Sequence, residues 1–142
     1  MRTVLQRVTR ARVRVDGETV GEIEGPGLVA LVGATHDDGP AQVDLTVRKI
    51  AELRIMRDEQ SVSDIGGQVL LVSQFTLAAD TRSGMRPSFT TAAPPAEAER
   101  GYNRLVEICR QKHAPGVEIG RFGAHMVISL INDGPVTFLL RP

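Results

Sequence analysis

The amino-acid sequence predicts an α+β fold: a single domain over residues 1–142 in which a curved, mostly antiparallel or mixed sheet, barrel-like in shape, carries two to three helices. Three observations support this prediction. Polar and apolar residues alternate with the period of a strand near the start, two later segments have apolar residues at helical spacing, and short apolar runs indicate buried strands. Glycine and proline occur between these segments, as expected of one compact domain.

The first predicted strand covers residues 4–15. From residue 10 onward it alternates cleanly, with arginine at the even positions and alanine or valine at the odd positions up to Val15. Val4 and Val8 precede this stretch and have the opposite parity. A change of parity within one strand indicates a bulge, or a strand that passes between two packed surfaces.

Turn signals separate the next predicted elements. Asp16-Gly17 favours a tight hairpin turn into a second strand that ends at Ile23. Gly25-Pro26-Gly27 predicts another turn, and the fully apolar run 28–32 predicts a central strand after it. Residues 37–40, Asp-Asp-Gly-Pro, are typical of a helix start, because acidic side chains favour the positive helix end and proline fits the first turn.

Two helices and three further strands complete the predicted order. Each helix has an apolar stripe at helical spacing. The second helix follows residues 92–95, and Pro115-Gly116 is expected to end it. A double glycine at 66–67 precedes the first of the three strands. The stripes comprise Val43, Val47, Ile50 and Ala51, then Tyr102, Leu105, Val106 and Cys109, and the strands cover residues 69–72, 126–131 and 136–140.

Composition excludes several classes of protein. With 42% hydrophobic and 24% charged residues, the chain is neither disordered nor a disulfide miniprotein. No apolar run approaches the ~18 residues of a membrane span, and no signal peptide is visible, so we expect a cytoplasmic protein without a membrane partner. Basic and acidic residues balance at 17 each, which argues against gripping long nucleic acid by counter-ion release alone.

The sequence predicts neither a metal site nor a cofactor. His36, His113 and His125 lack the spacing of metal ligands, and a single cysteine adds little. No nucleophile elbow, phosphate-binding loop or dinucleotide motif is present. Cys109 belongs to an apolar helix stripe, so we interpret it as a small buried hydrophobe.

Ser73-Gln74-Phe75-Thr76 follows the predicted strand 69–72 and is the first candidate site. At a strand end, backbone N–H groups are free to point at a ligand. The hydroxyls of Ser73 and Thr76 can then bind a substrate, and adjacent N–H groups can stabilise an oxyanion. The alternative interpretation is that these hydroxyls only end the strand through local turn hydrogen bonds.

Two further features are ambiguous when taken alone. In residues 132–137, Asn-Asp-Gly-Pro-Val-Thr, proline removes a donor and fixes the turn, and the Gly-Pro bond can be cis at modest cost. Gly-Pro also occurs at 25–26 and 39–40, so the dipeptide by itself indicates only a turn. Arg7 lies where the strand parity breaks, and its guanidinium either anchors a loop or reaches water.

Together these segments resemble the D-aminoacyl-tRNA deacylase family, also called D-tyrosyl-tRNA deacylases. The resemblance runs nearly end to end, and the blocks S-Q-F-T and N-D-G-P-V-T at this separation are specific in combination. One departure is the loop 57–63, which is several residues shorter than usual before the double glycine. The matching segments are residues 1–2, 6–8, 73–77, 79–82, 84–89, 120–124 and 132–137.

The resemblance implies a homodimeric esterase that removes D-amino acids from tRNA, with each active site near the subunit interface. It implies that the Gly134-Pro135 bond is cis and that this motif reaches into the partner's pocket, where flanking carbonyls crowd an L side chain. Arg7 would then brace the motif, supported by Asn132. Glycine has no side chain to reject, so glycyl-tRNA is expected to be cleaved too.

The resemblance also assigns residues to substrate binding. Phe89 and its neighbour Arg86 are expected to help form a pocket for the terminal adenosine of tRNA, with Ser73 and Gln74 beside the substrate. The partner molecule implied is thus the aminoacylated 3′ end of tRNA.

The chemistry expected of this site needs no catalytic triad. An aminoacyl ester is already activated, so positioning and oxyanion stabilisation are sufficient. We expect the backbone N–H groups of Phe75 and Thr76 to hold the oxyanion while a water attacks, oriented by the 2′-hydroxyl of the substrate. Thr76 as a nucleophile is the second choice, because no neighbouring base in the sequence activates its hydroxyl.

Two other classes of function are considered. A catalytically inert tRNA-binding module of the same fold would retain tRNA without turnover and tolerate changes at Phe75 and Thr76. A general small-ester hydrolase would cleave free D-amino-acid esters as well as the tRNA ester.

Overall fold

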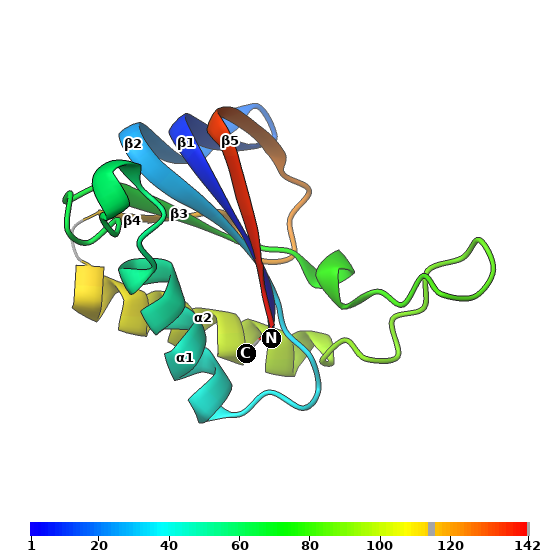
Figure 1. Ribbon diagram of the computed structural model, residues 1–142. Helices are drawn as coiled ribbons and strands as arrows, with labels where there is room; N and C mark the ends of the chain where they lie inside the picture. The colour runs from blue at the N-terminus through cyan, green and yellow to red at the C-terminus, as the bar shows by residue number, and fades with distance from the viewer. Residues whose placement is uncertain (114–115, 142) are drawn as a thin grey trace.

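The computed structural model describes residues 1–113 and 116–141, and its centre is a curved five-stranded sheet in the order β4-β3-β2-β1-β5 (Figure 1). β1 pairs antiparallel with β2 and β5, whereas β3 pairs parallel with β2 and β4. The predicted α+β class with a mixed sheet is confirmed, although the sheet is open, with β4 and β5 as its edges. The strands are β1 (Arg2–Val15), β2 (Glu18–Gly33), β3 (Gln68–Ser73), β4 (Val117–Ile119) and β5 (Val127–Leu140).

Two α-helices, α1 (Pro40–Glu52) and α2 (Pro95–His113), cover one face of the sheet (Figure 1). They join β2 to β3 and β3 to β4, as parallel strand pairs require. Every residue of the two predicted apolar stripes is buried. The predicted helix end at Pro115 lies outside the described residues. Among the helices described, none is both long and apolar enough to cross a membrane.

β1 and β2 form a long hairpin that contains a bulge. Val8 pairs with Gly27 and Arg10 with Glu24, so two residues of β2 lie opposite Thr9 alone. The predicted bulge in the first strand is confirmed by the pairing with β5, where Val8 lies opposite Asn132 and Arg10 lies opposite Ile131, so that Thr9 is the extra residue of β1. The predicted turn at Gly25-Pro26-Gly27 is wrong, because Gly25 adopts a φ of 79° and accommodates the extra residue while β2 continues.

β5 also differs from the prediction, since the two expected strands are one. Val8 pairs with Asn132 and Gln6 pairs with Thr137, so residues 133–136 leave the ladder opposite Arg7 and the strand then resumes. The edge strand β4 is not predicted at all, because its three residues are too few to show a period.

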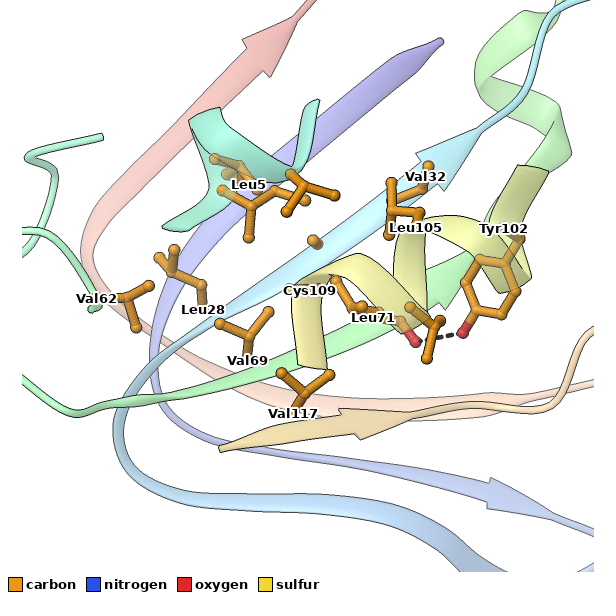
Figure 2. Packing of buried hydrophobic residues seen from close by; sticks show 14 of the residues in the cluster. Leu5, Leu28, Val32, Val62, Val69, Leu71, Tyr102, Leu105, Cys109 and Val117 are labelled. Carbon is orange, nitrogen blue, oxygen red and sulfur yellow. Dashed lines mark hydrogen bonds between the residues drawn. The ribbon is translucent and has the colours of Figure 1, made fainter. Parts of the chain in front are cut away.

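The sheet separates two apolar clusters. Between the sheet and the helices lies the larger cluster, which includes Leu5, Leu71 and Leu105 (Figure 2). There the hydroxyl of Tyr102 donates to the carbonyl of Leu71 at 2.8 Å, and burial raises the pKa of Tyr102 to about 12, so the donor stays protonated. Burial likewise raises the pKa of the Cys109 thiol to about 11, in keeping with its predicted role as a buried hydrophobe.

The smaller cluster lies on the other face of the sheet, where β1, β2 and β3 pack against residues 126–130. β3 is consequently buried on both faces, and only its ends can present polar groups to a ligand. The buried members are Val8, Ala11, Val13, Ile23, Val29, Leu70 and Val72, with Met126, Ile128 and Leu130 packed against them.

Removal of the Leu105 side chain should reveal how much α2 contributes to stability. Leu105 is fully buried, so Leu105→Ala is expected to lower the free energy of unfolding by about 3 kcal/mol, the usual loss for a buried leucine. Leu45→Ala in α1, where the side chain is exposed, is the control and should change it by less than about 1 kcal/mol. Urea unfolding followed by circular dichroism measures both, and equal losses would contradict the placement of α2.

Candidate functional site

The predicted S-Q-F-T block lies where β3 ends. Ser73 pairs with Val32 as the last residue of the strand, and the N–H of Gln74 still donates to the carbonyl of Val32 at 2.7 Å. The chain then turns into a short 3₁₀ helix, η2 (Phe75–Ala78). Gly33 permits this close approach, since a Cβ on it would lie 2.7 Å from the carbonyl oxygen of Gln74.

The first N–H groups of η2 are available to a ligand. The N–H of Leu77 donates to the carbonyl of Gln74 at 3.2 Å, which closes the turn. The preceding N–H groups, of Phe75 and Thr76, have no partner within such a turn. Among the described residues, no acceptor is found for either group. Both residues are exposed, so a carbonyl oxygen of a bound substrate can reach them.

A cavity of about 660 Å³ lies beside this turn. Phe75 and Phe89 line it with their ring centroids 5.2 Å apart and their planes tilted by 48°. The remaining wall is mostly alanine, proline and other apolar residues, and His125 is its one titratable side chain among the described residues. The full lining is Ser73, Gln74, Phe75, Phe89, Ala92, Ala93, Pro94, Pro95, Ala98, Phe122, Gly123, Ala124, His125, Met126 and Ile128.

Within residues 1–113 and 116–141, Thr76 has no base beside it. The Nε2 of Gln74 donates to its Oγ1 at 2.5 Å, and within the described residues no carboxylate, imidazole or amine is hydrogen-bonded to this hydroxyl. The nearest carboxylate along the chain, Asp80, is bound by Arg82, whose guanidinium holds the pKa of Asp80 at about 2. The hydroxyl of Ser73 makes no hydrogen bond in the described part of the chain. It therefore forms none of the local turn hydrogen bonds by which the alternative interpretation would end the strand.

The segment between η2 and α2 projects away from the body of the protein (Figure 1). Backbone hydrogen bonds between Asp80 and Ser88, at 2.7 and 2.9 Å, close its outer part. Arg86 is exposed in this outer part and is not among the cavity-lining residues, whereas Phe89 returns to the cavity. The structure therefore brings together Ser73, Gln74, Phe75 and Phe89, but not Arg86.

The second predicted block lies in the interruption of β5, and the Gly134-Pro135 bond is cis. Arg7 binds this segment with a side chain that is 12% exposed: its Nε donates to the carbonyl of Asp133 at 3.0 Å, and its Nη1 donates to the carbonyl of Ile55 at 3.2 Å. Asn132 pairs with Val8 in the ladder, and its exposed side chain makes no hydrogen bond within the described residues.

The two blocks lie far apart within one chain. Ser73 is connected through Val32 to Thr3 of β1, whereas Gly134 lies beside Arg7. Strand geometry thus separates them by about 13 Å along the strands and about 14 Å across them. Among residues 1–113 and 116–141, neither Gly134 nor Pro135 is found in the wall of the cavity.

Some site residues are missed by the sequence argument. Phe122, His125 and Met126 line the cavity from the loop before β5, yet the sequence predicts no role for Phe122 and His125 in the segment after the second helix, and predicts Met126 only as the first residue of a strand. Phe122 belongs to the matching block 120–124, which is the one signal that points to it. In the described ranges, no three His, Cys, Asp or Glu residues are grouped so as to hold a metal ion.

Comparisons with known proteins identify relatives over the whole chain. The sequence model of the family described as D-Tyr-tRNA(Tyr) deacylase matches residues 4–141. A protein from Stenotrophomonas maltophilia and one from Xanthomonas campestris pv. campestris, both named D-aminoacyl-tRNA deacylase, are 65% and 59% identical over the full length of both chains. Each alignment spans 147 positions against 142 residues here, so at least five positions have no counterpart in this chain.

Solved structures share the fold. A structure described as c-Myc DNA Unwinding Element Binding Protein superposes with a TM-score of 0.95 at 40% identity, covering 100% of this chain and 99% of the other. A probable eukaryotic D-amino acid tRNA deacylase superposes with a TM-score of 0.83 over 98% and 97% of the two chains. At 17% identity, the second similarity concerns the fold alone.

Proposed function

Because the chain belongs to the D-Tyr-tRNA(Tyr) deacylase family, hydrolases that act on ester bonds, we propose that it hydrolyses the ester of D-aminoacyl-tRNA and releases the free D-amino acid and tRNA. The observation that carries the proposal is the turn at Phe75 and Thr76, whose N–H groups have no acceptor among the described residues, next to an apolar cavity that Phe75 and Phe89 line. This arrangement combines a donor pair for an oxyanion with a site for a planar base.

The cavity suits the terminal adenosine of tRNA. Phe75 and Phe89 offer exposed aromatic faces, and stacking of a base on such a ring contributes about 1–3 kcal/mol. Ser73 and Gln74 line the same cavity and provide polar groups for the ribose. A site that takes only the end of tRNA needs no long basic surface, which agrees with the zero net charge of the chain.

The reaction proceeds through oxyanion stabilisation. The carbonyl oxygen of the ester accepts hydrogen bonds from the N–H groups of Phe75 and Thr76, and each such donor lowers the barrier by about 3 kcal/mol. A water attacks the carbonyl carbon, its proton passes by way of the 2′-hydroxyl, and the 3′-oxygen leaves protonated as the C–O bond breaks. Thr76 remains the second choice as nucleophile, because its hydroxyl accepts from Gln74 and no base in the described part of the chain is hydrogen-bonded to it.

A second copy of the chain completes the site as a homodimer. Gly134 and Pro135 are exposed and too far from the cavity of their own chain, so they serve the cavity of the partner. β5 is an edge strand with several exposed apolar side chains, a pattern typical of a surface that is covered by another chain. These side chains are Val127, Ile131, Phe138 and Leu139.

Backbone carbonyls around Gly134 and Pro135 then reject L-amino acids by steric exclusion. An L side chain at the substrate Cα meets these carbonyls, whereas a D side chain points away from them. Glycine has no side chain to exclude, so glycyl-tRNA is also a substrate. This mode of selection does not recognise the side chain of the D-amino acid, so its identity matters little.

Turnover of three matched substrates tests the proposed function. The purified protein should hydrolyse D-tyrosyl-tRNA and glycyl-tRNA, and should hydrolyse L-tyrosyl-tRNA at least about 10²-fold more slowly, the size of a steric rejection of about 3 kcal/mol. Release of radiolabelled amino acid measures all three rates. Retention of tRNA without release would instead indicate an inert binding module, and equal release from free D-tyrosine ethyl ester would indicate a general esterase.

Thr76→Ala separates the two catalytic roles considered for this residue. If the backbone N–H groups dominate, kcat for D-tyrosyl-tRNA stays within about tenfold of the wild type, whereas removal of a nucleophile lowers kcat by about 10⁶-fold. Thr19→Ala, an exposed threonine in β2, is the matched control. With Thr76→Ala and with Thr19→Ala, a substrate that lacks the 2′-hydroxyl should react at least about 10²-fold more slowly than the substrate that carries it.

The proposed homodimer is tested at the edge strand. Ile131→Asp introduces a charge into the exposed apolar side of β5 and should shift the sedimentation coefficient from dimer to monomer. Leu45→Asp, at an exposed position of α1, is the control and should leave the dimer intact. A wild-type protein that sediments as a monomer would contradict the shared site.

A further inference from the structure

We propose that Arg57 is a positioning residue for the Gly134-Pro135 segment: its guanidinium binds the Asp133 carboxylate and holds the segment in the place from which it rejects L-amino acids. This inference rests on the proposed function. Arg57 lies at the start of the loop 57–63, between α1 and β3.

The segment needs an anchor outside the sheet. Residues 133–136 leave the ladder between β1 and β5 and lie opposite the single residue Arg7, so they lack the regular cross-strand hydrogen bonds of a sheet. Gly134 and Pro135 are both exposed. Among the described residues, side-chain contacts from Arg7 and Arg57 hold this segment, and steric rejection requires its position to be defined to a fraction of an ångström.

Two arginines from different parts of the chain meet on Asp133. Arg57 Nη2 lies 2.7 Å from Asp133 Oδ1, and Arg7 Nε lies 3.5 Å from Oδ2 while it donates to the backbone carbonyl of the same residue at 3.0 Å. The Asp133 side chain is 19% exposed, so its charge is partly withdrawn from water and depends on these partners. Without Arg57, Oδ1 loses its only protein partner among the described residues.

Backbone contacts fix the position from which the Arg57 side chain extends. Arg57 begins the 3₁₀ turn η1 (Arg57–Glu59), and the preceding N–H of Met56 donates to the carbonyl of Gln60 at 2.9 Å across this turn. Met56 is buried in the larger cluster and fixes the start of the turn. Arg57 itself is 71% exposed, so only its guanidinium contact, and no core packing, is lost on substitution.

Arg7 and Arg57 form a closed arrangement. Arg7 joins Asp133 to the carbonyl of Ile55, two residues before Arg57, and Arg57 joins the same loop back to Asp133. The segment that carries Gly134 is thus attached at two points to one loop, which restricts rotation about a single contact. The side chains of Arg7, Arg57 and Asp133 line a cavity of about 330 Å³, whereas Ile55 contributes only its backbone carbonyl.

The experiment compares Arg57→Ala and Arg57→Lys with the wild type in the full-length protein. An ion pair with an exposed partner shifts the equilibrium between the held and the displaced segment by about two- to fivefold. Arg57→Ala should therefore raise the ratio of L- to D-tyrosyl-tRNA hydrolysis by about that factor. Arg57→Lys keeps the charge and should restore most of the wild-type ratio. Arg48→Ala is the matched control, since Arg48 is equally exposed at 70% and is paired with Glu52 in α1.

Hydrogen exchange provides a readout that does not depend on activity. Exchange of the backbone amides in residues 131–138, followed by mass spectrometry, should be faster by a similar factor in Arg57→Ala and unchanged in Arg48→Ala. The inference would be overturned if Arg57→Ala had the same ratio of L- to D-tyrosyl-tRNA hydrolysis and the same exchange rate as Arg48→Ala. Faster exchange with unaltered rejection of L-tyrosyl-tRNA would also overturn it, because the contact would then be structural only.

Failure of the proposed function would look different. In that case the wild type itself would release no D-tyrosine from D-tyrosyl-tRNA, whatever residue stands at position 57. The exchange comparison would still decide whether Arg57 holds the segment, with faster exchange in Arg57→Ala supporting the contact and equal exchange excluding it.

Discussion

The backbone ladder of β1 determines where both halves of the candidate site lie. Its first residues pair with β2, and through Val32 they set the position of Ser73 at the end of β3. Arg7, in the middle of the same strand, binds the segment that carries Gly134. β1 can serve both halves because a bulge after Val8 lets it contribute Leu5 to one apolar cluster and Val13 to the other. A slip of one residue in this ladder would move both halves.

The distribution of polar groups follows from this arrangement. Since β3 is buried on both faces, its free N–H groups occur only where the strand ends, and there the chain turns at Phe75 and Thr76 beside an apolar cavity. Two arginines, Arg7 and Arg57, converge elsewhere, on Asp133. The donor pair and the segment held by arginines are thus separate parts of one chain, and the proposed homodimer is the arrangement that joins them.

Most of the fold could be predicted because its signals are local. The helix stripes that contain Val47 and Leu105 follow from periodicity alone, since an amphipathic helix needs no knowledge of its partner. The turn expected at Gly25-Pro26-Gly27 is wrong for the opposite reason. Glycine and proline signal a break in regular structure, but whether the chain reverses or only bulges depends on the neighbouring strand, here β1. The three residues of β4 acquire their strand form only from β3.

The sequence by itself determined the fold class, the two helices and the two blocks in which the candidate site residues lie, because periodicity and short motifs are properties of neighbouring residues. Only the tertiary structure decided which of those residues meet. It placed Phe89 against Phe75 and left Arg86 outside, and it brought Arg57 to Asp133 from 76 residues away. Contacts of this kind depend on where strands and loops converge in space, and no local pattern in the chain encodes which distant residues meet.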